Sequence, residues 1–502
     1  MFNERKIGII ISYINILLQT LINFIYVPIL LYYIGKNEYG LYQLIGSFIA
    51  YFSIMDFGLT AAVIRFYTKY KALNDKISME NILAISTRCY IAITLILFII
   101  GYICYLFLDD IFYNSMTLVE ISSAKNIFIL LLLNIVVTIS TMIFRAIINA
   151  HEKFLFLKGI ETIQLVLQPI LVIVILQEHP YAFSVALVQT ILNIFLSVAR
   201  CIYCFKILKI RIKYHYWDKE LFKEFKKLAL SVFAVTLIDQ VFFKTNQIIL
   251  GIISGTSIVA VYAIASLIYM NYMALATAIS GVYLPHITKM IAKRESMKII
   301  SDLFINIGRW QYFLLAAISS GFFIFGKVFI DFWAGKGFED AYWITLLIII
   351  PFTIDLIQNI GLAILQAQNK YYFRAKVYFC MGVFNLCLAI PLAKIYGGIG
   401  CAFATGLSMF IGNGLIMNWY YLNITKLDII LFWKNISKIT IGVIIVTIIG
   451  YIFNGMIEDK NIIVFIMKLL IYTILYIGVM YKFFMNIDEK SKIKSLVLKF
   501  KR

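Results

Sequence analysis

Charged side chains lie inside several long apolar runs of this sequence. Asp239 and Lys244 lie deep in one run, Asp355 lies in another, and Asp56 and Arg65 belong to the second run of the chain. An uncompensated charge in hydrocarbon costs several kcal/mol, so such residues normally face a water-filled cavity or an oppositely charged partner. We interpret Asp239, Lys244 and Asp355 as candidate cavity-lining residues, with a structural ion pair as the alternative. Asp56 and Arg65 lie nearer the end of their run, where a ligand contact and an ion pair that tethers a loop are equally good interpretations.

Amide and charged side chains also recur at helical spacing along four of the runs. The four sets are Asn15, Gln19 and Asn23; Glu161, Gln164 and Gln168; Gln240, Lys244, Asn246 and Gln247; and Asp355, Gln358 and Asn359. Residues three or four apart share or adjoin one helix face. Arg145 and Arg309 lie nearer the ends of two further runs. The simplest arrangement collects these side chains around a shared water-filled cleft, and ordinary hydrogen bonds between helices are the alternative.

The composition places these residues in an integral membrane protein. Hydrophobic residues make up 62% of the chain and charged residues 14%, and the mean hydropathy is +0.90. A soluble chain of this length cannot cover its surface with so few charges. Apolar runs of about 18 residues or more read as membrane-spanning helices, and they recur along the whole chain. We predict an all-α polytopic protein with about fourteen spans: 7–33, 40–68, 82–108, 121–149, 154–177, 181–205, 228–252, 257–283, 304–326, 340–367, 374–396, 398–424, 432–454 and 461–485.

Basic residues set the predicted orientation. Most lie in one alternating set of loops and in both terminal segments. The opposite loops hold Lys36, Lys125, Lys327, Lys336, Lys394 and Lys460. Cytoplasmic loops carry the excess of Lys and Arg, so both termini are predicted to be cytoplasmic. The net charge of +19 then faces anionic lipid of the inner leaflet rather than nucleic acid.

A weak internal repeat divides the chain. A shift of about 220 residues aligns Gly35 with Gly255, and a similar shift aligns Ala150 with Ala367 and Lys153 with Lys370. Repeats of this kind are typical of transporters, whose ligand site lies between the halves. The predicted parts are a six-helix lobe (1–206), a basic cytoplasmic linker (207–227), a second six-helix lobe (228–425), an extra helix pair (426–485) and a basic cytoplasmic tail (486–502).

Cysteine and histidine give no sign of a redox or metal site. The seven cysteines lie in or beside apolar runs, and the four histidines show no metal-ligand spacing. We therefore expect no cofactor, no metal ion and no catalytic residues.

The stretch from Pro28 to Phe66 carries a motif. It reads PILLYYIGKNEYGLYQLIGSFIAYFSIMDFGLTAAVIRF. It resembles the N-terminal signature of bacterial polysaccharide flippases of the multidrug/oligosaccharidyl-lipid/polysaccharide exporter superfamily. The matching residues are Pro28, Gly35, Glu38, Tyr39, Gly40, Leu41, Tyr42, Asp56, Phe57, Gly58, Leu59, Arg65 and Phe66. AHEKF, at Ala150 to Phe154, is similar to the turn after the fourth span of that family.

The resemblance implies a V-shaped transporter of two six-helix lobes and a C-terminal helix pair, like the multidrug and toxin extrusion proteins. It would lie in the bacterial plasma membrane and move undecaprenyl-diphosphate-linked oligosaccharide, such as an O-antigen or capsule precursor, to the outer leaflet. A polysaccharide polymerase and a chain-length regulator are the protein partners that this role would bring.

The resemblance also implies roles for individual residues. Cations suit a diphosphate and amides suit sugar hydroxyls. The predicted substrate-binding residues are Gln19, Asn23, Arg65, Arg145, Gln240, Lys244, Asn246, Gln247 and Arg309. If an ion gradient drives transport, as in an antiporter, the candidate coupling residues are Asp56, Glu161, Asp239 and Asp355.

Other classes of membrane protein stay open at this point. A multidrug extruder of the same superfamily would usually have fewer spans and a more acidic cleft. A peptidoglycan lipid-precursor flippase shares the fourteen-span plan, but the sequence Glu38-Tyr39-Gly40 favours the polysaccharide branch. A membrane glycosyltransferase or polymerase should carry a large outside loop with catalytic acids, whereas Asp109 and Asp110 are the only acidic pair before a modest loop.

Overall fold

The computed structural model describes residues 2–217, 219–281, 283–368, 370–458 and 461–500. Lys460 and the last two residues of the predicted tail lie outside these ranges. All regular elements in the described ranges are helices. Contacts between residues divide the chain into two units, Met1–Ala263 and Ile264–Arg502.

The helices of the first unit include a 3-10 helix, η1, and a π-helix, η2. They are α1 (Phe2–Phe52), η1 (Ser53–Asp56), α2 (Leu59–Ala72), α3 (Lys76–Phe112), α4 (Leu118–Ala150), α5 (Phe154–Leu176), α6 (Ala182–Ile202), η2 (Tyr203–Ile207), α7 (Lys219–Ser254) and the start of α8 (Thr256–Gly281).

The second unit holds the rest of α8 and the remaining helices, of which η3 and η4 are π-helices. These are α9 (Leu284–Ala292), α10 (Met297–Trp333), α11 (Asp340–Leu356), α12 (Ile360–Ala367), α13 (Tyr371–Met409), η3 (Phe410–Ile416), α14 (Met417–Asn423), α15 (Ile429–Met456), α16 (Ile462–Val479), η4 (Met480–Phe484) and α17 (Ile487–Phe500).

The predicted spans all fall on helices. In the described ranges, ten helices are long and apolar enough to cross a membrane, or eleven if the bent pair α11 and α12 counts as one span. Two of the ten, Leu18–Ala72 and Tyr371–Asn423, cover two predicted spans each. The predicted span 228–252 lies on α7, which is not among the ten and carries several polar residues. The structure therefore confirms the all-α polytopic class and agrees with about fourteen spans.

The two double-length helices break at glycines. Gly35 has φ 74° and Gly397 has φ 55°, and both lie at predicted loops. Glycine enters this left-handed region without the steric penalty that a Cβ atom brings. The chain can therefore turn between two spans there with almost no loop.

The structure agrees with the internal repeat at both aligned places. Gly255, the partner of Gly35 in the alignment, also has positive φ, at 82°, and separates α7 from α8. Lys153 and Lys370 occupy the same place in two turns, because each immediately precedes a helix, α5 and α13 respectively. The aligned residues of the repeat therefore lie in corresponding turns of the structure.

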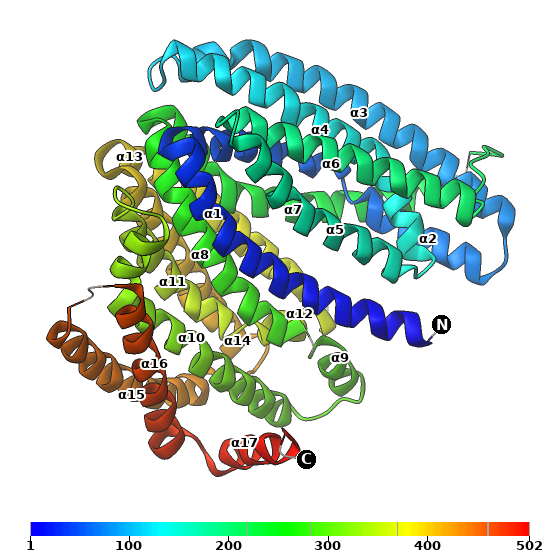
Figure 1. The fold of residues 1–502 in the computed structure, drawn as a ribbon. Coiled ribbons are helices and arrows are strands. Elements are labelled where there is room, and N and C mark those ends of the chain that lie inside the picture. The colour runs from blue at the N-terminus through cyan, green and yellow to red at the C-terminus, as the bar shows by residue number, and fades with distance from the viewer. Residues whose placement is uncertain (1, 218, 282, 369, 459–460, 501–502) are drawn as a thin grey trace. The chain divides into compact units, whose positions relative to one another are not determined.

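The long helix α1 lies at the centre of the first unit. It packs against α4, α5, α6 and α7, and α3 runs beside α4 (Figure 1). Two glycines allow α1 to lie close to α7 and to the start of α8. A methyl group at Gly40 would lie 1.9 Å from the carbonyl oxygen of Thr256, and one at Gly251 would lie 2.4 Å from Leu44 Cδ1. The Gly40 position therefore has no room for a side chain, and a side chain at Gly251 would displace that of Leu44.

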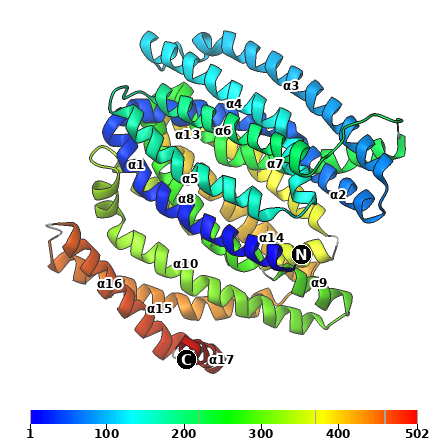
Figure 2. The ribbon, with the colours of Figure 1, turned by 45° about the vertical axis from the view of Figure 1, so that its right-hand side comes forward.

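The predicted extra helix pair packs on α10 within the second unit. Phe313 and Phe325 of α10 meet Val443 of α15 and Phe465 of α16 in one apolar cluster. Tyr472 of α16 donates a hydrogen bond of 2.7 Å to Ser320 Oγ. Figure 2 shows α10, α15 and α16 running alongside one another. The pair is thus held by burial and by hydrogen bonds to α10.

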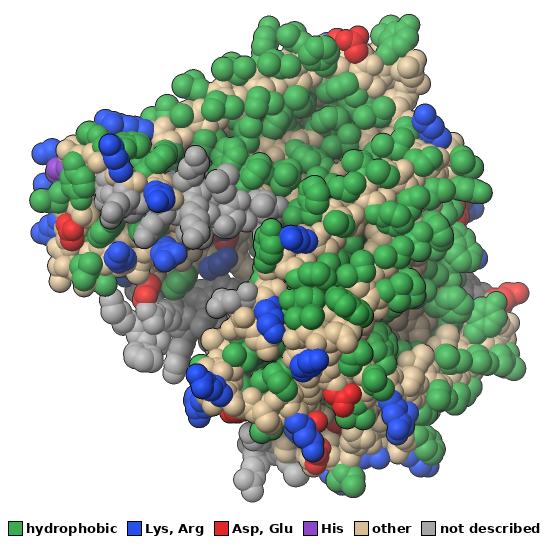
Figure 3. Space-filling view, turned by 180° about the vertical axis from the view of Figure 1, so that it is seen from behind, with side chains coloured by type: hydrophobic (Ala, Val, Ile, Leu, Met, Phe, Trp, Pro, Cys, Tyr) green, Lys and Arg blue, Asp and Glu red, His purple; other side chains and the backbone are tan. Residues whose placement is uncertain are grey.

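The surface is dominated by apolar side chains. Long stretches of α3, α15 and α16 expose Ile, Leu and Phe residues. Figure 3 shows hydrophobic side chains covering broad areas, with Lys and Arg gathered in patches beside them. Exposed apolar surface on this scale is what a bilayer covers.

Two segments outside the predicted spans have defined structure. Residues 208–217, inside the predicted linker 207–227, are irregular and lie beside α3, and α7 begins at Lys219. The predicted tail 486–502 contains α17. The contact boundary at residue 263 falls inside α8, later than the predicted lobe boundary, because α7 packs against α1 and α2.

Candidate functional site

A cluster of cations surrounds Glu161 in the first unit. Arg145 Nη2 of α4 lies 2.9 Å from Glu161 Oε1, and Lys158 Nζ lies 2.9 Å from Oε2. Arg200 Nη2 of α6 lies 3.7 Å from Oε1. Three helices thus supply cations to a single carboxylate, which we call the Glu161 cluster (Arg145, Lys158, Glu161 and Arg200).

The Glu161 cluster has more positive charge than its own carboxylate can balance. Three cations face one anion, so the cluster carries an excess of two positive charges. Arg145 keeps 43% of its side chain exposed, whereas Arg200 keeps 12%. The Nε atom of Arg200 is buried and has no hydrogen-bond partner among the described residues. Guanidinium groups with unused donors bind phosphate and carboxylate oxygens well.

The amide face of α1 borders this cluster. Thr162 Oγ1 donates a hydrogen bond of 2.6 Å to Asn15 Oδ1, and Asn15 Nδ2 donates to the carbonyl oxygen of Lys158 at 3.4 Å. Further along the same face, Gln19 is exposed and Asn23 is half-buried. No hydrogen bond joins either side chain to another described residue. Both amides remain available to hydroxyl groups of a ligand.

The polar residues of α7 divide into two groups. Gln247 and Thr245 hydrogen-bond to α1, at Ser47 and Tyr51, and Asn246 donates to the Tyr262 hydroxyl at 2.9 Å. These contacts fix α7 on α1 and on the start of α8.

The other group lies toward the middle of α7. Asp239, Gln240 and Lys244 are half-buried. Among the described residues, Lys244 has no ion-pair or hydrogen-bond partner, and the Oε1 atom of Gln240 has none either. Lys244 therefore brings an uncompensated cation into the first unit.

The signature residues Asp56 and Arg65 lie apart. Asp56 is half-buried and accepts hydrogen bonds from Thr60 at 2.8 Å and from Tyr90 at 3.0 Å. Arg65 is exposed, with its guanidinium 5.6 Å from the centre of the Phe66 ring. Asp56 thus joins η1 to α2 and α3.

The second unit holds Arg309 and Asp355, and each has a charged partner there. Arg309 is 2% exposed and its Nε and Nη2 atoms bind both carboxylate oxygens of Glu489, at 2.7 and 2.9 Å. Asp355 is buried, and its Oδ1 atom lies 3.5 Å from Arg374 Nη2. Both pairs are internal to the second unit.

The sequence analysis left Lys158, Arg200 and Arg374 out of the site, because they lie near the predicted cytoplasmic ends of their spans. A usable signal existed for Arg200. It ends the sixth predicted span on the same side as Arg145 and Glu161, so the three lie at similar depth. The pairing of Arg309 with Glu489 had no such signal, because 180 residues separate them.

These features define a polytopic transporter-type fold whose first unit contains a cationic cluster lined by amides. Residues 6–291, more than half of the chain, match the family model described as "Polysaccharide biosynthesis protein". The chain belongs to this family.

A curated relative and two solved structures are similar over most of the chain. A Shigella flexneri protein, "Putative O-antigen transporter", is 22% identical over 404 residues, which cover 77% of this chain and 90% of that protein. The lipid II flippase MurJ in an inward closed conformation has a TM-score of 0.71 at 17% identity, over 95% of this chain and 99% of that one. An inward-facing multidrug resistance MATE family transporter of the MOP superfamily has a TM-score of 0.62 at 13% identity, over 82% and 95%. The fold that the chain shares with these two structures confirms the expected all-α polytopic fold class.

Proposed function

We propose that this protein flips polyprenyl-diphosphate-linked oligosaccharide, the precursor of a surface polysaccharide such as O-antigen or capsule, from the cytoplasmic to the outer leaflet. The observation that carries the proposal is the family match over residues 6–291, which contains the whole Glu161 cluster. The name of the Shigella flexneri relative and the fold shared with a lipid II flippase support it.

The Glu161 cluster suits the diphosphate. Arg145 and Arg200 come from different helices, and their planar guanidinium groups can bind several phosphate oxygens at once. The excess of two positive charges matches a diphosphate better than a neutral or cationic solute. Gln19 and Asn23 on α1 would bind sugar hydroxyls, and Lys244 on α7 supplies a further cation within the first unit.

Arg65, Gln240, Asn246, Gln247 and Arg309 complete the proposed set with smaller roles. Gln247, Asn246 and Arg309 already make contacts inside their own units, so we assign them to holding helices in place. Arg65 and Gln240 keep donor or acceptor atoms available.

An ion gradient would supply the driving force. Asp56, Glu161, Asp239 and Asp355 are the carboxylates that could exchange a proton or bind a cation, and all four are buried or half-buried. Each would change its contacts when it changes charge. A protonated Asp56 would accept weaker hydrogen bonds from Thr60 and Tyr90 than the carboxylate does. A protonated Asp355 would lose its charge attraction to Arg374.

The proposed setting is the bacterial plasma membrane with both termini in the cytoplasm. The excess of basic residues in alternate loops supports this orientation. A polysaccharide polymerase and a chain-length regulator would receive the flipped lipid. The protein itself would catalyse no covalent change.

Deletion of the gene tests the proposal. We expect a lipid-linked glycan other than the peptidoglycan precursor to accumulate in the inner leaflet, where a membrane-impermeant reagent cannot reach it. Re-expression of the wild-type protein should clear it. Accumulation of the peptidoglycan precursor instead would favour the alternative precursor flippase. Normal lipids together with increased sensitivity to cationic drugs would favour a multidrug extruder.

A further inference from the structure

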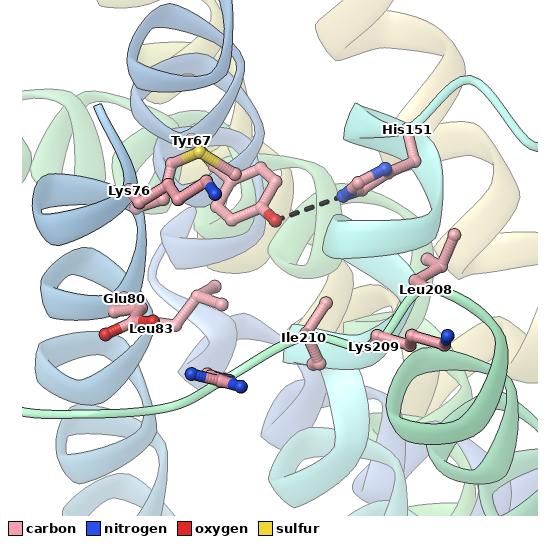
Figure 4. A pocket seen from close by; sticks show the side chains of 10 residues that line it. Tyr67, Lys76, Glu80, Leu83, His151, Leu208, Lys209 and Ile210 are labelled. Atoms are coloured by element: carbon pink, nitrogen blue, oxygen red, sulfur yellow. Dashed lines mark hydrogen bonds between the residues drawn. The ribbon is translucent and has the colours of Figure 1, made fainter. Parts of the chain in front are cut away.

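A basic pocket lies in the first unit and involves none of the residues of the Glu161 cluster. Its volume is about 370 Å³, within the range of pockets that hold small ligands. It lies among the end of α2, the start of α3, the turn between α4 and α5, and residues 208–211 (Figure 4). We call it the rim pocket.

The polar lining of the rim pocket is mostly cationic. Lys76 of α3 and Lys209 and Arg211 of the irregular segment contribute three exposed cations. Glu80 is the only carboxylate in the lining, and His215 Nε2 lies 2.9 Å from its Oε2 atom. Positive charge therefore exceeds negative charge around the cavity.

The neutral groups add a further hydrogen-bond donor. Lys71 Nζ lies 2.9 Å from His151 Nδ1, and an ammonium can only donate, so Nδ1 accepts. The proton of the neutral ring is then on Nε2, which donates to the Tyr67 hydroxyl oxygen at 3.0 Å (Figure 4). The Tyr67 hydroxyl hydrogen is left without an acceptor among the described residues. Burial, with the neighbouring Lys71 and Lys153, lowers the pKa of His151 from 6.5 to about 4, which agrees with a neutral ring.

The wall formed by the irregular segment is held in place before any ligand arrives. Asn81 of α3 is 1% exposed, and its side chain binds the backbone of this segment in three hydrogen bonds of 2.9 to 3.3 Å, at His215 N, Tyr216 N and Tyr216 O. The Arg88 guanidinium lies 4.0 Å from the centre of the Tyr214 ring. We call residues 208–217 the strap. Because the strap backbone is already ordered, binding of an anion to Lys209 and Arg211 has to order only their side chains.

Apolar groups beside the pocket favour a lipid over a free ion. Met79, Leu83 and Ile210 form part of the lining. Phe205 and Ile207, just before the strap, are 45% and 61% exposed at the end of the apolar α6 and η2. Inorganic phosphate would make no use of these surfaces, whereas the glycerol and acyl parts of a phospholipid would. Basic pockets between helices at the cytoplasmic side of a membrane suit anionic headgroups.

We propose that the rim pocket binds the phosphodiester headgroup of an anionic membrane phospholipid, which bridges the start of α3 and the strap. Lys76, Lys209, Arg211 and Tyr67 donate to the phosphate oxygens, and the apolar lining receives the glycerol. The bound lipid reinforces the attachment of the strap to α3 that the Asn81 side chain already provides. The proposal is independent of the transported substrate.

Thermal unfolding of the purified full chain in neutral detergent tests this. Short-chain phosphatidylglycerol at about ten times its Kd should raise the unfolding temperature by about 2 °C. Phosphatidylcholine of the same chain length should not. The variant Lys209→Gln/Arg211→Gln should bind phosphatidylglycerol with a Kd about tenfold higher, as read from the lipid concentration that raises the unfolding temperature. Tyr67→Phe should raise the Kd less.

The matched control is Lys206→Gln/Lys213→Gln. Lys206 and Lys213 are exposed basic residues that flank the pocket segment and do not line the pocket. The control should respond to lipid like the wild type. The proposal is wrong if the control loses as much affinity for phosphatidylglycerol as the pocket variant does. It is also wrong if phosphatidylcholine raises the unfolding temperature as much as phosphatidylglycerol. Full protection by inorganic phosphate at the same concentration would replace the lipid with a free phosphate.

Discussion

At the scale of residues, the cations of this protein differ in whether a carboxylate compensates them. Glu489 balances the charge of Arg309 alone, and the Nε and Nη2 atoms of Arg309 donate to its two carboxylate oxygens. Arg145, Lys158 and Arg200 share Glu161, so two of their positive charges have no carboxylate. A ligand anion gains most where the protein itself leaves charge uncompensated. This distinction places the Glu161 cluster ahead of Arg309 as a ligand site.

His151 makes the turn between α4 and α5 sensitive to acid. The pKa of His151 is about 4 in the folded protein, below the unfolded value of 6.5. Between pH 4 and pH 6.5 the ring is therefore protonated in the unfolded chain and mostly neutral in the folded protein. Stability from this group is present above pH 6.5 and is lost as the pH falls toward 4. We expect a loss of about 1 kcal/mol between pH 7.5 and pH 5, smaller than the whole shift would give because the ring is partly solvated.

Unfolding temperatures of His151→Gln measure this effect. The variant should lose less stability than the wild type over the same pH change. His286→Gln serves as the control because the His286 side chain is exposed. An identical pH dependence for the wild type and His151→Gln would show that folding does not lower the pKa of His151.

Residue types were predictable, and their partners were not. The cost of charge in hydrocarbon singled out Asp355, Lys244 and Glu161 from the sequence alone. The partner of Asp355 is Arg374, which lies at the start of the next predicted span and reads there as an ordinary cytoplasmic basic residue. Pairing depends on how helices pack, and hydropathy carries no information about that.

At the scale of elements, α17 is tied to α10 by a buried ion pair. Besides binding Arg309, Glu489 accepts a hydrogen bond of 2.7 Å from the backbone of Asn486, just before α17. Arg309 also donates to the carbonyl oxygen of Phe484 at 3.1 Å. One arginine on α10 thus fixes both the end of η4 and the start of the C-terminal helix.

Glu489→Gln should destabilise the second unit strongly. The substitution leaves the Arg309 guanidinium buried without a counter-charge, which costs about 3 kcal/mol. Asp488→Asn, at an exposed neighbouring position of the same helix, is the matched control. The double variant Arg309→Met/Glu489→Leu should recover much of the loss because it removes both charges. Equal unfolding temperatures for Glu489→Gln and Asp488→Asn would contradict the role of the pair.

The helix breaks were better predicted than the strap. Gly35 and Gly397 lie between apolar runs, so the sequence alone predicted a turn at each. The strap falls within the predicted basic linker 207–227, whose course was not predicted. Its course is set by Asn81, more than 130 residues earlier, whose buried amide takes up the backbone groups of the strap.

At the scale of the whole molecule, most of the fold could be predicted from hydropathy and the distribution of charge. Apolar runs located the spans, and the family match and the fold shared with the MurJ structure agree with that plan. The halves of the repeat can be recognised in matching turns at Gly35 and Gly255 and at Lys153 and Lys370. The proposed transport function depends on one further step, which is that the cationic cluster of the first unit binds the diphosphate.

Translocation of a polyprenyl-diphosphate-linked oligosaccharide by the purified protein in vesicles is the measurement that tests this step most directly. The variant Arg145→Gln/Arg200→Gln keeps the Lys158–Glu161 pair and removes the excess charge. We expect its initial rate to fall by about tenfold or more, because each charge-assisted hydrogen bond contributes roughly 1.5–3 kcal/mol. Lys69→Gln, at an exposed position outside the cluster, should transport at the wild-type rate. Wild-type transport by the double variant, or an equal loss in Lys69→Gln, would contradict the account.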